Sequence, residues 1–201
     1  MLLACGNGAV SVAEHTGVAS GVAALAVATV PLFTLLCGYF WGARNTRLEW
    51  AGIVLGLIGI AMLNLGSNLQ SSPLGAALLV FAAATWAFGS VWSKHLPLPQ
   101  GAMASAVEML VGGVVLLIAS AVSGEHLQQV PPVEGWAALA YLTVFGSIIA
   151  FNAYMYLLKH VRPAAATSYA YVNPAVAVLL GIVFVGETIG LEEALAMLVI
   201  I

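Results

Sequence analysis

Charged residues are scarce in this sequence of 201 residues. Aspartate is absent, five lysines or arginines and eight glutamates make up 6% of the chain, and 62% of the residues are hydrophobic. A soluble domain carries charge on about 25–35% of its surface positions, so a water-soluble fold is excluded. Intrinsic disorder is also excluded, because disordered chains are poor in apolar residues. A net charge of −3 with five scattered cations excludes a nucleic-acid partner.

Cysteine is scarce as well. Cys5 and Cys37 lie in apolar runs without a second cysteine or a histidine at metal-ligand spacing. The sequence therefore indicates neither a disulfide framework nor a zinc site. Because aspartate is missing, no carboxylate cluster is predicted for another metal. We expect no metal and no cofactor.

Long uncharged runs dominate the sequence instead. Residues 15–43, 50–93, 135–158 and 163–186 carry no charge, and the 44-residue run contains a polar, turn-forming break at 66–73. A run of 24 residues makes about 36 Å of helix, more than the ~30 Å hydrocarbon core of a bilayer. We predict an all-α integral membrane protein in contact with the lipid bilayer. Six complete spans are expected at 18–42, 48–65, 73–92, 101–122, 135–158 and 163–185, with partial spans at 1–13 and 191–201.

The charges predict the orientation of these spans. Every second loop between successive spans lies on the same side of the membrane, and such loops are said to have one parity. All five cations fall in three loops of one parity, which contain Arg44 and Arg47, Lys94, and Lys159 with Arg162. The loops of the other parity hold glutamates and no cation: Glu14, Glu125, Glu134 and Glu187. The positive-inside rule therefore places the cationic loops in the cytoplasm.

The sequence also contains an internal repeat. An offset of 143 residues aligns 18–58 with 161–201 without a gap, with ten of 41 pairs identical, Pro31 on Pro174 among them. An offset of 145 places Asn7 on Asn152. The loops of the two copies differ in the sign of their charge, which favours copies of opposite orientation, as in many secondary transporters. The offset predicts five helices in each copy and ten in an intact protein, of which this sequence is a part.

Polar residues inside the spans are the candidates for function, because each must find a partner, a cavity or a role. Glu108 is the one acid well inside a span and shares a helix face with Ser105 and Gly112. We interpret it as a candidate for proton coupling. The alternative is a structural glutamate at a helix contact.

Two pairs of polar residues share helix faces. Asn152 with Tyr156, and Tyr169 with Asn173, are each four residues apart. They could hydrogen-bond the polar end of a small solute and stack on its apolar part, or they could join helices. Asn7 would face the same cavity from the first copy.

Four further residues are weaker candidates. Trp86 and Ser90 are again four residues apart, although tryptophan often serves in packing or as an interface anchor. Pro31 and Pro174 each remove a helical hydrogen bond and predict helix kinks near mid-span, which discontinuous transporter helices use and which are also ordinary in membrane helices.

The Gly17/Gly21, Gly38/Gly42 and Gly52/Gly56 pairs predict close helix packing.

A carrier for a small solute is the leading functional hypothesis from these features. An intramembrane enzyme is the rival, but no Gly-x-Ser-Gly nucleophile occurs, and His15, His95, His126 and His160 all fall at span ends. A helix bundle without transport activity is the third possibility. Few charges line the spans, which favours a neutral or zwitterionic solute. The oligomeric state, including a homo-oligomer, is left open.

Several segments resemble a known family, the EamA branch of the drug/metabolite transporter superfamily. They are Gly6 to His15, Val30 to Phe33, Leu48 to Ile53, and Thr167 to Pro174. The resemblance implies a multi-pass carrier of the bacterial inner membrane, with two inverted five-helix repeats, that exports amino acids, metabolites or drugs. Residues 1–69 would be the C-terminal part of the first repeat, and 70–201 the second, incomplete in its last helix. Gly186-Glu187 matches the family's second repeat, whereas Arg44 replaces the corresponding glutamate of the first.

Overall fold

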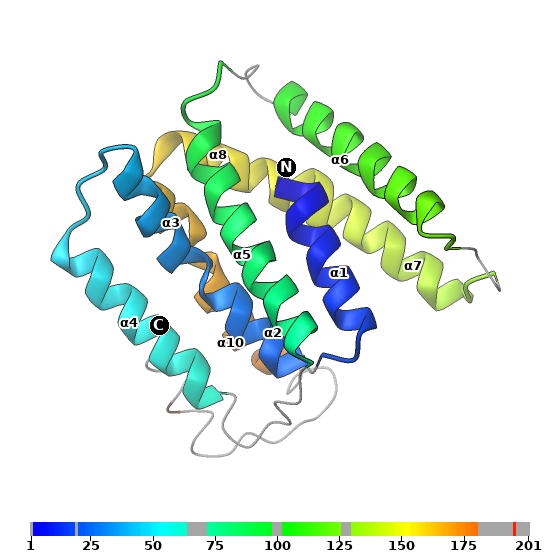
Figure 1. The fold of residues 1–201 in the computed structure, drawn as a ribbon, viewed down its shortest axis with the longest axis horizontal. Helices are drawn as coiled ribbons and strands as arrows, with labels where there is room; N and C mark the ends of the chain where they lie inside the picture. Colours follow the sequence, from blue (N-terminus) through cyan, green and yellow to red (C-terminus); the bar gives the residue numbers. More distant parts are fainter. Residues whose placement is uncertain are drawn as a thin grey trace.

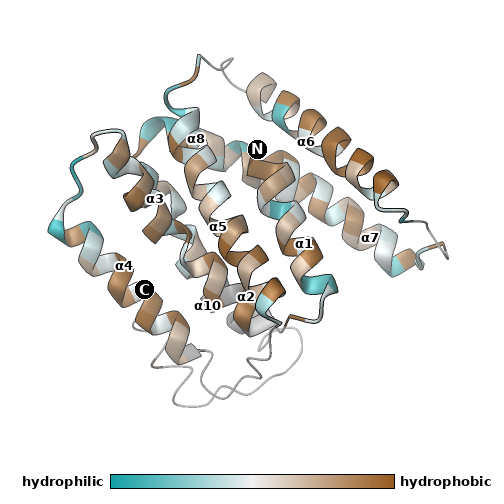
Figure 2. Ribbon diagram, in the orientation of Figure 1, coloured by the Kyte–Doolittle hydropathy of each residue, from teal (hydrophilic) through white to brown (hydrophobic). Residues whose placement is uncertain are grey.

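The computed structural model is helical throughout the residues it describes, which are 2–18, 20–63, 72–97, 102–125, 130–180 and 195. Most of the helices are rich in apolar residues from end to end (Figure 2). In chain order the elements are η1 (Leu2–Asn7), α1 (Gly8–His15), α2 (Ser20–Ala28), α3 (Val30–Phe40), α4 (Arg47–Leu63), α5 (Pro73–Ser93), α6 (Ala102–Val122), α7 (Val133–Tyr141), η2 (Leu142–Phe151), α8 (Asn152–His160), α9 (Pro163–Thr167) and α10 (Tyr169–Leu180), where η marks a π-helix.

Helix α5 lies at the centre of the bundle (Figure 1). It packs against η1, α1, α2 and α3. Helix α4 lies at one side and contacts α2 and α10, while α6 packs against η1 and α8 on the other side. Helices α6 and α7 expose most of their apolar side chains, such as Leu117 and Trp136. Exposed apolar helix faces of this length fit a lipid environment.

Three of the predicted spans are confirmed. The helices Pro73–Ser93, Ala102–Val122 and Val133–His160 are each long and apolar enough to cross a membrane. Helix α4 covers most of the predicted span at 48–65, and its last two residues lie outside the described part. Helices α9 and α10 cover 163–180 of the sixth span, whereas 181–185 and nearly all of 191–201 lie outside it. The protein is an all-helical membrane protein.

The first predicted span is not one continuous helix. It divides at Thr29 into α2 and α3, two residues before Pro31. Proline has no N–H to donate, so the turn before it loses a regular hydrogen bond. The Thr29 backbone and hydroxyl groups both donate to the carbonyl of Ala26 instead, at 3.0 and 2.6 Å. Pro174 behaves differently, because α10 continues past it to Leu180 and the break between α9 and α10 falls at Ser168.

Local sequence signals define the helix ends. The Ser72 hydroxyl accepts a hydrogen bond from the Gly75 N–H and caps α5. Thr46 and Glu49 form a reciprocal capping box at the start of α4. Among the predicted packing glycines, Gly17 and Gly42 have φ of 81° and 76°, so they serve helix ends rather than helix contacts. Gly56 does pack, against the ring of Tyr171.

Two helices change from π to α geometry at matching positions of the repeat. The π-helix η1 ends at Asn7, and η2 ends directly before Asn152, the residue that the 145-residue offset aligns with Asn7. The α-helices that follow, α1 and α8, end at His15 and His160, which the same offset also aligns. π-helical turns are rare inside α-helices and are frequently found at functional sites.

The two matching helices run in opposite directions. After α1, the side chains of Thr16 and Val18 lie against Gly75, at the start of α5. After α8, the Val161 carbonyl accepts a hydrogen bond from Lys94, at the end of α5. Since α1 and α8 end at opposite ends of the same central helix, they are antiparallel (Figure 1).

Candidate functional site

The cationic loops meet at one end of the bundle. Lys94 Nζ donates to the Val161 carbonyl at 2.6 Å, and burial lowers the pKa of the Lys94 ammonium. Arg162 donates to the Arg44 carbonyl at 2.6 Å and forms an ion pair with Glu49, with 3.0 Å between Arg162 Nε and Glu49 Oε1. These contacts join three loops that are far apart in the sequence, as the common parity of their charges predicts.

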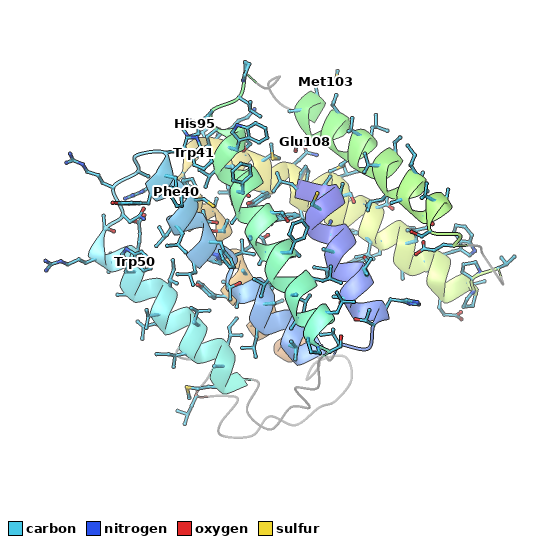
Figure 3. The ribbon with its side chains drawn as sticks, viewed as in Figure 1. Phe40, Trp41, Trp50, His95, Met103 and Glu108 are labelled. Atoms are coloured by element: carbon cyan, nitrogen blue, oxygen red, sulfur yellow. The ribbon has the colours of Figure 1, made fainter. Side chains whose placement is uncertain are left out.

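Aromatic side chains line the same end. The rings of Trp41 and His95 stack with 5.9 Å between centroids, and Trp41 also contacts Phe88 (Figure 3). His160 stacks on Tyr156 at 3.9 Å. Both histidines lie at helix ends, which agrees with their interpretation as interfacial residues. His126 lies outside the described part.

A group of aromatic and hydroxyl side chains lies deeper, among α5, α8 and α10. The Ser90 hydroxyl donates to the Trp86 carbonyl at 2.7 Å and lies 2.6 Å from the Tyr154 hydroxyl. Because serine has a single proton to donate, Tyr154 donates to Ser90. The Tyr154 ring also packs on the rings of Trp86 and Tyr169, with centroid distances of 5.8 and 5.5 Å. We call Trp86, Ser90, Tyr154 and Tyr169 the aromatic cluster.

Helix α6 adds polar atoms next to this cluster. Ser105 is 1% exposed, and its Oγ and Glu108 Oε2 are buried. Neither atom makes a hydrogen bond within the described ranges. Buried polar atoms are nearly always hydrogen-bonded, so these two atoms of α6 call for an explanation.

A pocket of about 190 Å³ opens beside Glu108. Its lining comes from η1 and α6, and the Glu108 side chain points from α6 toward the rest of the bundle (Figure 3). Leu3 lines this pocket and also packs against the buried face of η2 and α8 that contains Tyr154. The lining residues are Leu2, Leu3, Val107, Glu108, Val111 and Gly112.

The polar groups of three helices lie at a common depth. Trp86, Glu108 and Tyr154 each lie six or seven residues from the helix end next to the cationic loops, whereas Tyr169 is the first residue of α10, six residues after the start of α9. At 1.5 Å per residue this places their backbones about 10 Å inside the bundle. The residue intervals are 86 to 93, 102 to 108, 154 to 160 and 163 to 169.

The structure brings together only some of the predicted site residues. Trp86, Ser90 and Tyr169 meet in the aromatic cluster, with Glu108 beside it. Tyr156 is 61% exposed and lies on another face of α8 from the buried Tyr154. Asn152 is half-buried and donates to the Ile148 carbonyl at 2.6 Å. Asn7 and Asn173 are exposed, so a cavity shared by these residues stays a prediction.

Tyr154 is the site residue that the sequence reasoning missed. It belongs to a buried face of η2 and α8 with the spacing i, i+3, i+4 and i+7, formed by Phe151, Tyr154, Met155 and Leu158. This spacing is that of the packed face of a helix, but in a span that is apolar on every side hydropathy does not distinguish it from the other faces. Pairing Asn152 with Tyr156 selected a neighbouring face instead. No described group of three histidine, cysteine or acidic side chains is arranged to hold a metal.

Comparison with known proteins identifies the family. Residues 73–201 match the EamA-like transporter family. The chain is 56% identical over its whole length to the uncharacterized inner membrane transporter YedA of Escherichia coli K12, of which it spans 66%. It is 24% identical over 180 residues to the uncharacterized transporter YdfC of Bacillus subtilis, covering 88% of this chain and 58% of YdfC.

A further relative carries a more specific description. Over 171 residues, the chain is 26% identical to a protein of Streptantibioticus cattleyicolor described as a "Probable terminal-alkyne amino-acid exporter". The match covers 85% of this chain and 58% of that protein. The resemblance found in the sequence is therefore confirmed, and the chain belongs to the EamA-like transporter family as a multi-pass protein of the bacterial inner membrane.

Proposed function

We propose that the intact protein is a secondary carrier, not an enzyme, that exports a small neutral or zwitterionic solute by alternating access. The observation that carries this proposal is the antiparallel pair of matching helices, η1–α1 and η2–α8, each with its π-to-α change at an asparagine. Inverted copies of one unit allow a carrier to open to either side by rocking one copy against the other.

The same pair supports a repeat arrangement for the longer protein. Residues 1–69 would be the end of the first repeat and 70–201 most of the second. With five helices in each repeat, the intact protein would have ten, of which this chain holds six complete and two partial. The antiparallel course of α1 and α8 agrees with the opposite loop charges of the two copies.

The aromatic cluster and Glu108 support the choice of solute. Trp86, Tyr154 and Glu108 lie about 10 Å from the ends of their helices, and every lysine and arginine of the sequence lies in a predicted loop. A bound anion would therefore lack a counter-charge, whereas a neutral or zwitterionic solute would not require one. The relative described as an amino-acid exporter suggests amino acids as the first solutes to test.

Transport into inside-out membrane vesicles tests the proposal. The vesicles would come from cells producing the intact protein and would be supplied with a panel of radiolabelled neutral amino acids and a proton gradient. We expect concentrative uptake of at least one amino acid that stops when an ionophore collapses the gradient. Vesicles from cells lacking the protein are the control. If both preparations behave alike while the protein is abundant in its membrane, the carrier proposal is wrong.

A further inference from the structure

We propose that the three cationic loops form a gate between the cytoplasm and the aromatic cluster, and that this gate opens when the contacts between the loops break. The loops are the one between α3 and α4, the one that follows α5, and the one between α8 and α9. The inference rests on the proposed carrier function, and it names the device that controls the cytoplasmic side of the transport cycle.

Each of these loops contacts the other two. The Trp41 ring, directly after α3, stacks on the ring of His95, in the loop after α5, with 14° between the ring planes (Figure 3). Lys94, in that same loop, donates to the carbonyl of Val161, directly after α8. These two contacts connect the loop after α5 to both of its neighbours.

An arginine makes the third connection. Arg162, directly before α9, donates to the Arg44 carbonyl in the loop between α3 and α4. It also pairs with Glu49 in the first turn of α4. The contacts therefore form a closed circuit of three loops, which we call the loop ring.

The loop ring lies next to the buried aromatic cluster, on its cytoplasmic side. Ser90 is four residues before Lys94 in the chain, and Tyr154 is seven residues before Val161, which corresponds to about 6–10 Å along a helix. Ser90 is 0% exposed, and Tyr154 is also buried. A solute that comes from the cytoplasm would meet the loop ring before it reached the cluster.

The contacts of the loop ring can form and break in water. The side chain of Arg162 is half exposed, Lys94 is exposed, and an exposed ion pair contributes little to stability. The cluster beneath is instead packed against apolar side chains such as Met155 and Leu158, which are costly to separate. Weak contacts above a well-packed layer allow two conformations of similar free energy, as a gate requires.

A cysteine beneath the loop ring would report its opening. The reporter is Ser90→Cys in the intact protein, with every other cysteine replaced by serine. Inside-out membrane vesicles present the cytoplasmic side to an impermeant thiol reagent. Because the thiol is buried while the gate is closed, its labelling rate measures the fraction of molecules with an open gate.

Variants of the loop ring should be labelled faster. Arg162→Gln should raise the rate about 1.4- to fivefold, which corresponds to about 0.2–1 kcal/mol. Lys94→Met, which keeps the chain length and removes the donor, should also raise it. Adding Glu49→Gln to Arg162→Gln should cause no further rise, because both changes remove one contact. Arg47→Gln is the matched control at an exposed arginine outside the loop ring, and should be labelled at the unaltered rate.

Two further measurements separate an open gate from other effects. An anionic and a cationic methanethiosulfonate should show the same increase, because a change in local charge alone would affect them in opposite directions. In intact cells, where the reagent reaches only the periplasmic side, the variants should be labelled no faster than the unaltered protein. Faster labelling from both sides would indicate a loosened fold and would overturn the gate.

The outcomes separate the gate from the carrier proposal. Unchanged cytoplasmic labelling in both Arg162→Gln and Lys94→Met, together with solute flux by the unaltered protein, would keep the carrier and overturn the gate. Faster cytoplasmic labelling in these variants, without flux of any solute by the unaltered protein, would keep the gate and overturn the carrier.

Discussion

A single hydrogen bond between two hydroxyl groups shows how one residue can order the aromatic cluster. Tyr154 is 7% exposed, its ring contacts Trp86 and Tyr169, and its hydroxyl donates to Ser90. A buried phenol without that partner would carry the desolvation cost of an unpaired polar group. The bond therefore fixes the orientation of the ring and, with it, the aromatic faces beside Glu108.

Replacing Tyr154 by phenylalanine tests this at the residue scale. Tyr154→Phe keeps the ring and removes only the hydrogen bond, so we expect a loss of about 0.5–1.5 kcal/mol in the free energy of unfolding. Thermal unfolding in detergent measures it. Tyr141→Phe is the control, because Tyr141 is 61% exposed and removal of its hydroxyl group should have little effect on the free energy of unfolding. Equal changes in both variants would contradict the role of the bond.

At the scale of elements, one side chain connects helix ends that are far apart in the sequence. Glu49 accepts from the Thr46 N–H at 2.7 Å in the capping box and also pairs with Arg162, at the start of α9. The Asn45 side chain donates to the Leu35 carbonyl at 3.0 Å and closes the last turns of α3. The loop between α3 and α4 is thus held by its own hydrogen bonds and by the ion pair.

A double-mutant cycle measures this ion pair. Glu49→Gln preserves a capping acceptor and removes the charge, and Arg162→Gln removes the opposite charge. The Arg162 side chain is 49% exposed and that of Glu49 19%, so we expect a coupling of about 0.2–1 kcal/mol that shrinks in high salt. Arg47→Gln, at an exposed cation of the same segment, is the control for general charge effects. If the changes in the free energy of unfolding of the two single variants add up to that of the double variant, the ion pair contributes nothing to stability.

At the scale of the whole molecule, the charges and the helix directions give one consistent topology. The loops that carry cations meet at one end of α5, and the segment around Thr16 lies at the other end. Because cations are retained on the cytoplasmic side, the end that holds Lys94 should face the cytoplasm and the end that holds Glu14 and Glu125 the periplasm.

Cysteine labelling in intact cells tests this topology. Cys5 and Cys37 would first be replaced by serine, and single cysteines then introduced at 14, 44, 94, 125, 159 and 187. An impermeant maleimide should label positions 14, 125 and 187 only. Position 187 lies outside the described residues, so its labelling also tests the sequence prediction by itself. Labelling of position 94 from outside would overturn the orientation and the helix count.

The sequence determined the membrane environment, three long spans and the end of the bundle at which the cations gather. These features depend on local composition, because a run of about 20 apolar residues is driven into lipid whatever its partners are. The break near Pro31 has a local cause, since proline removes a helical hydrogen bond, although α10 continues through Pro174 with the same local signal. Each of these properties is set by residues that are neighbours in the chain.

Only the tertiary structure decided which helix faces point inward. In water the apolar face of a helix marks the core, but lipid is as apolar as leucine, so hydropathy does not separate the inward face of a span from the outward one. For this reason the pairing of Asn152 with a polar residue four positions later selected Tyr156. In the structure it is Tyr154 that is buried, against Trp86 and Tyr169. The contact of Arg162 with Glu49 likewise depends on how helices pack, because the two residues are 113 positions apart and share no local signal.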